Sequence, residues 1–292
     1  MITAPARAAG VVIEHARVSV GRSMVRRRLR AVADGRAAAI EIDLHRGPVD
    51  VVGELAHLTA RMADGSPPLA RLQAAFDRAG ACDAAIDGLA SRLAVHRIRS
   101  ARSVGALKAE RAVAWVAPLL SADEAEVRET AARALGRIGG VRSADALVRA
   151  IERRGATRTL IVELSRAAPD LYLEAALFGP RRAGVIPAVA AAAGLRRRQT
   201  AVGPLLALLV SGSRKERVVA CRALGWIGSR RSVPVLIAAI ADREWKVRLS
   251  AAKSLAALHA PARGAALEAL LADRHPRVQK AGRQAQRRLA RE

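Results

Sequence analysis

The sequence predicts an all-α protein, a right-handed α-solenoid in which pairs of helices stack one on the next. Three observations support this prediction. A unit of 31 residues recurs in the C-terminal half of the chain, aromatic residues make up only 2% of it, and glycine follows the second helix of the two best-aligned units. Ala- and Leu-rich segments favour helices, whereas sheets use β-branched and aromatic residues. A helix pair of this size cannot bury its apolar face alone, so consecutive units must stack.

The repeat is clearest when its copies are aligned. Corresponding positions lie 31 residues apart, as in Leu224 and Leu255. An upstream copy, VRETAARALGRIGG at 127–140, aligns with ERVVACRALGWIGS at 216–229. Residues 143–200 fit the same unit only loosely.

Small residues and caps define the second helix of each unit. Ala131, Ala220 and Ala251 stand where two helices are expected to approach closely, and the following glycine suits a left-handed C-terminal position. We expect capping boxes at Asp123-x-x-Glu126 and Ser213-x-x-Glu216.

The pattern V-R-x-x-A-A-x-A-L-G-x-I-G, preceded by a helix of the SVPVLIAAI type, resembles bacterial HEAT repeats of the PBS lyase HEAT-like kind. The match is clear at 112–141 and 203–290, and Glu216 and Gln279 depart from it. The resemblance implies an armadillo-type superhelix whose second helices line a binding face. The repeat itself does not imply lyase activity.

Two regions are predicted. Residues 106–292 form the HEAT-like repeats, and residues 1–105 form an N-terminal helical region of degenerate or capping repeats, with helices at 50–63 and 68–95. Residues 22–35 predict a helix that ends at Gly35 and contains the basic segment 22–30. This helix either faces solvent or binds an anionic membrane or a partner. Residues 11–20 alternate as a strand does.

The chain is strongly basic, with a formal net charge of +24. Residues 1–150 contribute +7 and residues 151–292 contribute +17. Such an excess attracts phosphate, an anionic membrane or an acidic protein. An Arg-rich chain with only five Lys is also what G+C-rich codon usage produces, so the excess alone does not establish a function.

Motifs of catalysis and metal binding are missing from the sequence. There is no phosphate-binding loop, nucleophile elbow or H-E-x-x-H, and neither Cys82 nor Cys221 has a C-x-x-C partner. We therefore expect no enzyme activity, no cofactor and no metal. The two cysteines favour a reducing compartment, hence a cytoplasmic protein, and the apolar run 183–195 is too short to span a membrane. The irregular repeats at 143–200 remain the place where a carboxylate site could lie.

Three positions recur on the second helices and are the candidate contact positions. The first holds Arg or Gln (Arg128, Arg217, Arg248, Gln279), and we expect it to pair with turn acids such as Asp123 or Asp242. The second and third hold the candidate binding residues, to which Trp245 is added: Arg133, Arg137, Arg222, Trp226, Trp245, Lys253 and Arg288. Trp226 is expected to face solvent, with the alternative that it and Trp245 cover each other, whereas Trp115 is expected in the core.

The sequence thus favours a non-catalytic scaffold that binds a protein partner, membrane-associated partners included, through its second helices. A nucleic-acid-binding protein resembling HEAT-like DNA glycosylases is the alternative. The scarcity of aromatic rings and of acids at the three positions argues against it. A chromophore lyase-like protein is a third possibility, supported only by the name of the repeat.

Overall fold

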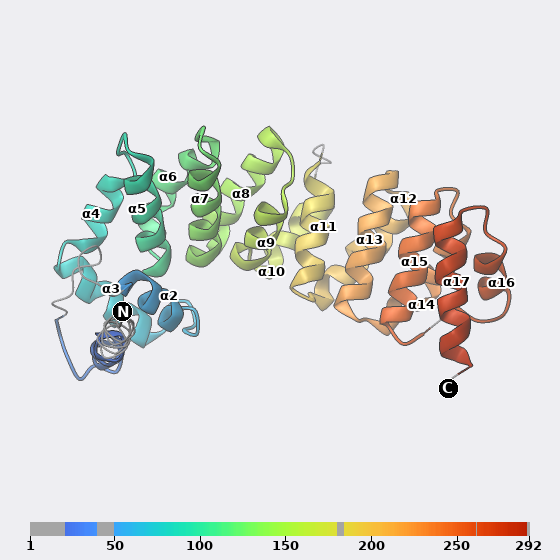
Figure 1. The fold of residues 1–292 in the computed structure, drawn as a ribbon, viewed down its shortest axis with the longest axis horizontal. Coiled ribbons are helices and arrows are strands. Elements are labelled where there is room, and N and C mark those ends of the chain that lie inside the picture. Colours follow the sequence, from blue (N-terminus) through green and yellow to red (C-terminus); the bar gives the residue numbers. More distant parts are fainter. Residues whose placement is uncertain (1–20, 40–49, 180–183, 261, 291–292) are drawn as a thin grey trace, which may run out of the picture. The chain divides into compact units, whose positions relative to one another are not determined.

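The computed structural model describes residues 21–39, 50–179, 184–260 and 262–290. Every regular element among these residues is a helix, as Figure 1 shows, and none is a strand. The all-α solenoid prediction is confirmed. The predicted strand at 11–20 lies outside the described residues.

The chain forms two compact units, Met1–Ser143 and Ala144–Glu292. The division falls within helix α8 (Gly140–Arg154). The boundary between the N-terminal helical region and the HEAT-like repeats, placed at 105/106 from the sequence, remains a prediction. So does the right-handed sense of the superhelix.

The first described element of unit 1 is a helix over residues 21–33 that buries Val25, Leu29 and Val32 and turns its arginines outward. This confirms the basic helix, which ends just before Gly35, and Gly35 adopts a left-handed conformation with φ +79°. The expected helix at 68–95 is interrupted at Gly80. The remaining elements of unit 1 are α2 (Val51–Thr59), α3 (Pro67–Arg78), α4 (Ala81–Gly88), α5 (Ala94–Ala106), η1 (Glu110–Ala112), α6 (Val113–Val116), η2 (Ala117–Ser121) and α7 (Ala125–Ile138).

Unit 2 consists of further helix pairs. Some first helices are short and flanked by 3₁₀ turns, whereas the second helices are longer. The elements after α8 are α9 (Arg158–Ala167), α10 (Asp170–Phe178), α11 (Val185–Leu195), η3 (Gln199–Ala201), α12 (Val202–Ser211), α13 (Arg214–Ile227), η4 (Arg230–Ser232), α14 (Val233–Ala238), η5 (Ala239–Ala241), α15 (Trp245–Ala257), α16 (Gly264–Leu271) and α17 (Pro276–Leu289).

Small residues set the distance between neighbouring second helices. A Cβ atom added at Gly225 of α13 would lie 3.0 Å from Cα of Ser254 in α15. One added at Gly194 of α11 would lie 2.7 Å from Cα of Ala223 in α13. These two contacts are one repeat apart in sequence, so α11, α13 and α15 stack with the same register. Ala220 and its counterparts Ala251 and Ala131 are fully buried, as expected.

An Arg–Asp ladder fixes the same register by charge. Arg217 donates from Nε and Nη2 to the carboxylate of Asp242 in the next repeat, at 2.8 and 3.0 Å. Arg248 makes the corresponding pair with Asp273, at 2.6 and 2.9 Å. Both arginines are largely buried in these pairs. The expectation that this position pairs with turn acids is therefore confirmed for Arg217 and Arg248. It is wrong for Arg128, which donates to the backbone carbonyls of Ala122 and Asp123.

The helix ends confirm one of the two expected capping boxes. Ser213 and Glu216 form theirs at the start of α13, and Gly228 closes that helix at φ +82°. The prediction of a capping box at Asp123 and Glu126 is wrong. The N-cap of α7 is Glu124, one residue after Asp123, and no side chain caps the helix there.

The core position expected for Trp115 is also wrong, since 51% of this residue is exposed. Helix α6 is a single turn that buries Val113 and Val116, three residues apart. Trp115 lies between them in sequence and therefore points away from the core.

Candidate functional site

The second helices of unit 2 present a regular set of exposed positions, which we call the second-helix grid. It consists of three rows that cross α13, α15 and α17, helices that lie side by side in Figure 1. Row one is Lys215, Lys246 and Arg277; row two is Arg222, Lys253 and Gln284; row three is Trp226, Ala257 and Arg288. All nine residues are exposed.

The helix geometry explains why these residues share one face. Positions i, i+7 and i+11 of an α-helix lie within about 40° of one another, at 100° per residue. On α13 these positions are Lys215, Arg222 and Trp226, and they lie opposite the buried Ala220 and Leu224. The 31-residue repeat then aligns one such set with the next.

The grid is electropositive because its cations are not neutralised by neighbouring acids. Six of its nine residues are Lys or Arg and none is acidic. The nearest turn acids are already paired: Asp242 and Asp273 belong to the ladder, and Glu244 lies 3.8 Å from Arg214. Arg288 donates to the carbonyl of Ala256 at 3.0 Å, a contact that leaves its charge uncompensated.

Trp226 is the aromatic residue of the grid, and its solvent-facing position is as expected. It is 44% exposed, and part of its ring lies against Gly194 of α11. Leu195, one repeat earlier at the equivalent position, is 45% exposed. Sequence analysis missed Leu195 because residues 143–200 align poorly, and it missed row one, although a spacing of 31 residues marks that row.

Trp245 is placed differently from Trp226. It is half-buried at the start of α15, and its ring stacks on His275, with centroids 3.7 Å apart and planes inclined by 10°. Lys246 and Arg277 lie near the same ring. The ring that covers Trp245 is therefore that of His275, and not that of Trp226.

The two predicted binding residues of unit 1 lie on α7. Arg133 is exposed and pairs with Glu129 at 2.8 Å. Arg137 also has an interaction partner. The α7 position equivalent to Lys215 is Glu126. The face of α7 is therefore mixed in charge.

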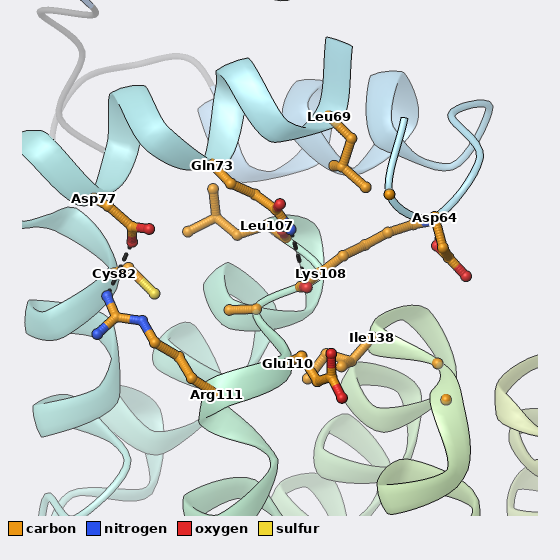
Figure 2. Close-up of a pocket in the computed structure, with 14 residues that line it drawn as sticks. Asp64, Leu69, Gln73, Asp77, Cys82, Leu107, Lys108, Glu110, Arg111 and Ile138 are labelled. Carbon is orange, nitrogen blue, oxygen red and sulfur yellow. Dashed lines mark hydrogen bonds and ion pairs between the residues drawn. The ribbon is translucent and has the colours of Figure 1, made fainter. Parts of the chain in front are cut away.

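Unit 1 also contains a pocket of about 430 Å³, drawn in Figure 2. Four of its charged groups are engaged with one another: Lys108 donates to Asp64 at 2.7 Å, and Arg111 to Asp77 at 2.9 Å. Cys82 at its wall is buried, and this burial raises the pKa of its thiol. The thiol therefore stays protonated at neutral pH, which does not suit a nucleophile.

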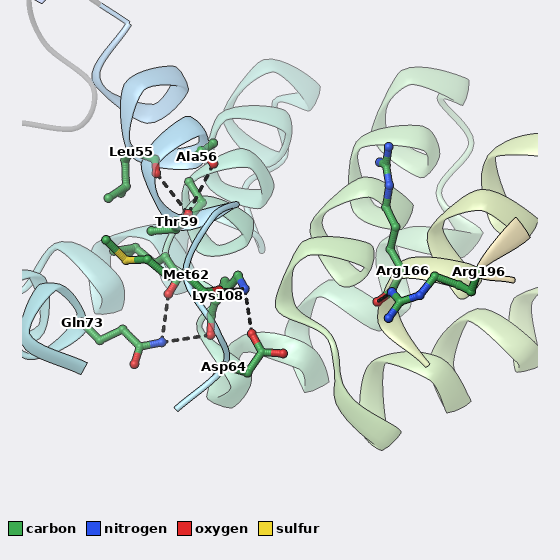
Figure 3. A network of polar contacts seen from close by, with 11 residues as sticks. Leu55, Ala56, Thr59, Met62, Asp64, Gln73, Lys108, Arg166 and Arg196 are labelled. Atoms are coloured by element: carbon green, nitrogen blue, oxygen red, sulfur yellow. Dashed lines mark hydrogen bonds and ion pairs between the residues drawn. The ribbon is translucent and has the colours of Figure 1, made fainter. Parts of the chain in front are cut away.

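The polar groups around this pocket tie the helices of unit 1 together (Figure 3). Thr59 donates to the carbonyl of Ala106 at 2.8 Å, and Gln73 donates to that of Leu107 at 3.0 Å. Lys108 also donates to the carbonyl of Met62, at 3.2 Å. It adopts a left-handed conformation with φ +49°, at the helix end where the equivalent residue after α7, Gly139, is glycine. These contacts give the pocket residues a structural role.

Two acids of the irregular repeats, one buried and one half-exposed, are likewise paired. Glu163, 3% exposed, accepts from Arg166 at 2.9 Å, and Asp170 accepts from Arg198 at 2.7 Å. In the described part of the chain, no cluster of His, Cys, Asp or Glu could hold a metal ion. The search for a helix of sufficient length and apolarity to cross a membrane finds none in the same residues.

The fold and the grid define a solenoid repeat protein with a basic face on its second helices. A family model for HEAT repeats matches residues 82–164 and 188–286. The chain therefore belongs to the HEAT-repeat family, as its sequence pattern indicated. The match begins at α4, earlier than the repeat pattern was visible in the sequence. No curated protein matches the chain.

Solved structures with a similar fold include three of quite different description. Human deoxyhypusine hydroxylase in complex with glycerol is 20% identical, covering 94% of this chain and 100% of that one, with a TM-score of 0.35. An engineered protein is 22% identical over 72% of this chain and 96% of its own, with a TM-score of 0.30. The CpcE–CpcF complex of phycocyanin lyase from Nostoc is 20% identical over 85% of this chain and 100% of that one, also at 0.30. These likenesses concern the fold alone.

Proposed function

We propose that this protein is a non-catalytic scaffold that holds a protein partner on the second-helix grid of unit 2. The exposed ring of Trp226 is the observation that carries the proposal. Burial of an aromatic ring by a partner is strongly favourable, and Trp is enriched among residues that dominate binding energy. Here the ring stands beside the exposed Leu195 and among cations, in the arrangement of an apolar anchor with a charged surround.

The residues proposed to contact the partner are those predicted from the sequence in unit 2, together with row one and Leu195. Arg222, Lys253 and Arg288 would steer an acidic partner toward the anchor, since exposed charges act mainly on the rate of association. Trp245, stacked on His275, would support the edge of the surface rather than anchor the partner. Arg133 and Arg137 of unit 1 would contribute less, because Arg133 already has an acidic neighbour.

The test compares Trp226→Ala with Trp115→Ala, a matched control at a residue of similar exposure in unit 1. Proteins retained by the immobilised full chain would be identified, and the purified partner then titrated against each variant by calorimetry. We expect Trp226→Ala to weaken binding about 30-fold, as for an anchor worth about 2 kcal/mol, and Trp115→Ala to leave it unchanged.

Two results would contradict the proposal. One is equal binding of the partner by both variants when their thermal melts show that both are folded. The other is tight binding of duplex or single-stranded DNA at about 150 mM salt that does not depend on Trp226. The second result would favour the nucleic-acid alternative.

A further inference from the structure

Row one of the grid indicates the chemistry of the bound partner in more detail than Trp226 does. Lys215, Lys246 and Arg277 are all cationic, all exposed and equally spaced, and no acid stands at the other grid positions. We propose that the segment held by the grid is an acidic amphipathic α-helix that lies across α13, α15 and α17. This inference rests on the proposed function and names the chemistry of the partner.

The spacing of the row matches a helix with an acid every seventh residue. Packed helices lie about 8–10 Å apart, so neighbouring cations of row one are separated by about that distance. Seven residues of an α-helix advance about 10.5 Å and return nearly to the same face. Acids seven residues apart would therefore meet Lys215, Lys246 and Arg277 in turn.

The width of the grid also suits a helix. Rows one and three are eleven residues apart on each second helix, about 16 Å. A ligand helix is about 10–12 Å wide with its side chains, so one lying midway between the outer rows leaves about 2–3 Å on either side, a gap that the long Lys and Arg side chains can span. An extended strand, at about 5 Å, covers only one row.

The two outer rows differ in character, which predicts an amphipathic ligand. Row one is entirely cationic, whereas row three begins with Trp226 and Ala257, beside Leu195. An acidic stripe would face row one and an apolar stripe would face Trp226. Single-stranded nucleic acid binds instead to several stacking rings in succession, and the grid has a single ring.

The probe is a fluorescein-labelled Ala-rich peptide about 21 residues long, long enough to form a helix. It carries Glu at every seventh position and Leu on the adjoining face. Three control peptides are a scrambled sequence of the same composition, a version with Lys in place of Glu, and a version with a central proline. Anisotropy titrations with the full chain near 150 mM salt should give the designed peptide at least about tenfold tighter binding than each control.

The protein variant that tests the row is Lys215→Glu/Lys246→Glu/Arg277→Glu. Its control, Arg153→Glu/Arg230→Glu/Arg231→Glu, makes the same change in net charge at exposed residues outside the grid. We expect the first variant to lose about tenfold or more in affinity for the designed peptide and the control to lose less than about threefold.

Each contrary outcome overturns a defined part of the inference. Equal binding of the scrambled peptide overturns the spacing, equal binding of the proline peptide overturns the helix, and equal loss in the two triple variants overturns the assignment to row one. A dissociation constant above about 1 mM for the designed peptide overturns the inference as a whole. The proposed function survives that last result if the captured partner still depends on Trp226, and fails if a dT20 oligonucleotide binds tightly without that dependence.

Discussion

The second helices α7 of unit 1 and α13 of unit 2 share a sequence pattern in their cores and differ where they face solvent. Both bury an Ala and a Leu at equivalent positions, Ala131 and Leu135 in α7 and Ala220 and Leu224 in α13. On the exposed side, α7 has acids beside its arginines, whereas α13 carries Lys, Arg and Trp. The repeat therefore determines packing, and each copy is free to vary its outer face.

The same contrast holds for the ion pairs. The ladder pairs of unit 2 are largely buried and bidentate, as in Arg248 with Asp273. The Arg133–Glu129 pair of α7 is half exposed and lies within one helix. Buried pairs are costly to break because one charge is left without compensation, whereas exposed pairs contribute little.

The largest expected effect on stability is the loss of a buried ladder pair, measured against the loss of an exposed pair. Asp273→Ala should lower the free energy of unfolding by about 3 kcal/mol, because it leaves Arg248 buried without its carboxylate. Glu129→Ala should change it by less than about 1 kcal/mol. Urea denaturation of both variants measures the difference, and similar losses would show that the two pairs are equivalent.

Overpacking the shared small positions should affect both units alike. Ala251→Leu and Ala131→Leu each place a large side chain where no solvent-accessible space exists, and should cost about 1–3 kcal/mol. Thermal melts would reveal the loss. A melting curve for Ala251→Leu that matches the wild type would show that the packing assignment in unit 2 is wrong.

Acid should weaken the ladder of unit 2. The hydrogen bonds from Arg248 are the main cause that holds the pKa of Asp273 below its ordinary value of 3.8. The stabilisation is therefore complete above that value and is lost as the pH falls through the lower pKa of the folded state. Urea midpoints of the wild type should fall on acidification below about pH 5, and those of Asp273→Asn should fall less. Parallel pH profiles would contradict this.

The smallest effect is expected on the exposed face itself. Arg222→Ala and Lys253→Ala should change the free energy of unfolding by no more than about 0.5 kcal/mol, since neither side chain is buried. Calorimetric melts of these variants check this, and a loss above about 1 kcal/mol would indicate that the grid has a structural rather than a binding role.

The sequence predicted the features that follow from repetition. Ala131, Ala220 and Ala251, the ladder arginines and the solvent-facing Trp226 were all identified from the 31-residue register, because a repeated contact requires a repeated residue. Trp115 was assigned wrongly because an apolar residue on a first helix was taken to be buried, whereas α6 is a single turn that buries only Val113 and Val116.

Residue type hid one feature that the register repeats. Glycine is usual at the left-handed end of a helix, and it occupies that position at Gly139 and Gly228. At the equivalent positions Lys108, Arg197 and His259 are also left-handed, although nothing in these residue types predicts that conformation. The exposed Leu195 escaped notice for a related reason, since the repeat that contains it has diverged.

The Arg–Asp ladder also has a direction, which bears on how the array could be lengthened. Each ladder arginine reaches forward to an aspartate of the next repeat, so a repeat needs a cation at this position wherever the following repeat carries that aspartate. In α17 the position holds Gln279, which donates to the carbonyl of Asp273 at 2.8 Å and has no charge to offer a following carboxylate. A further copy grafted after α17 would present an unpaired aspartate. Gln279→Arg is thus the substitution that would make this end of the array extendable.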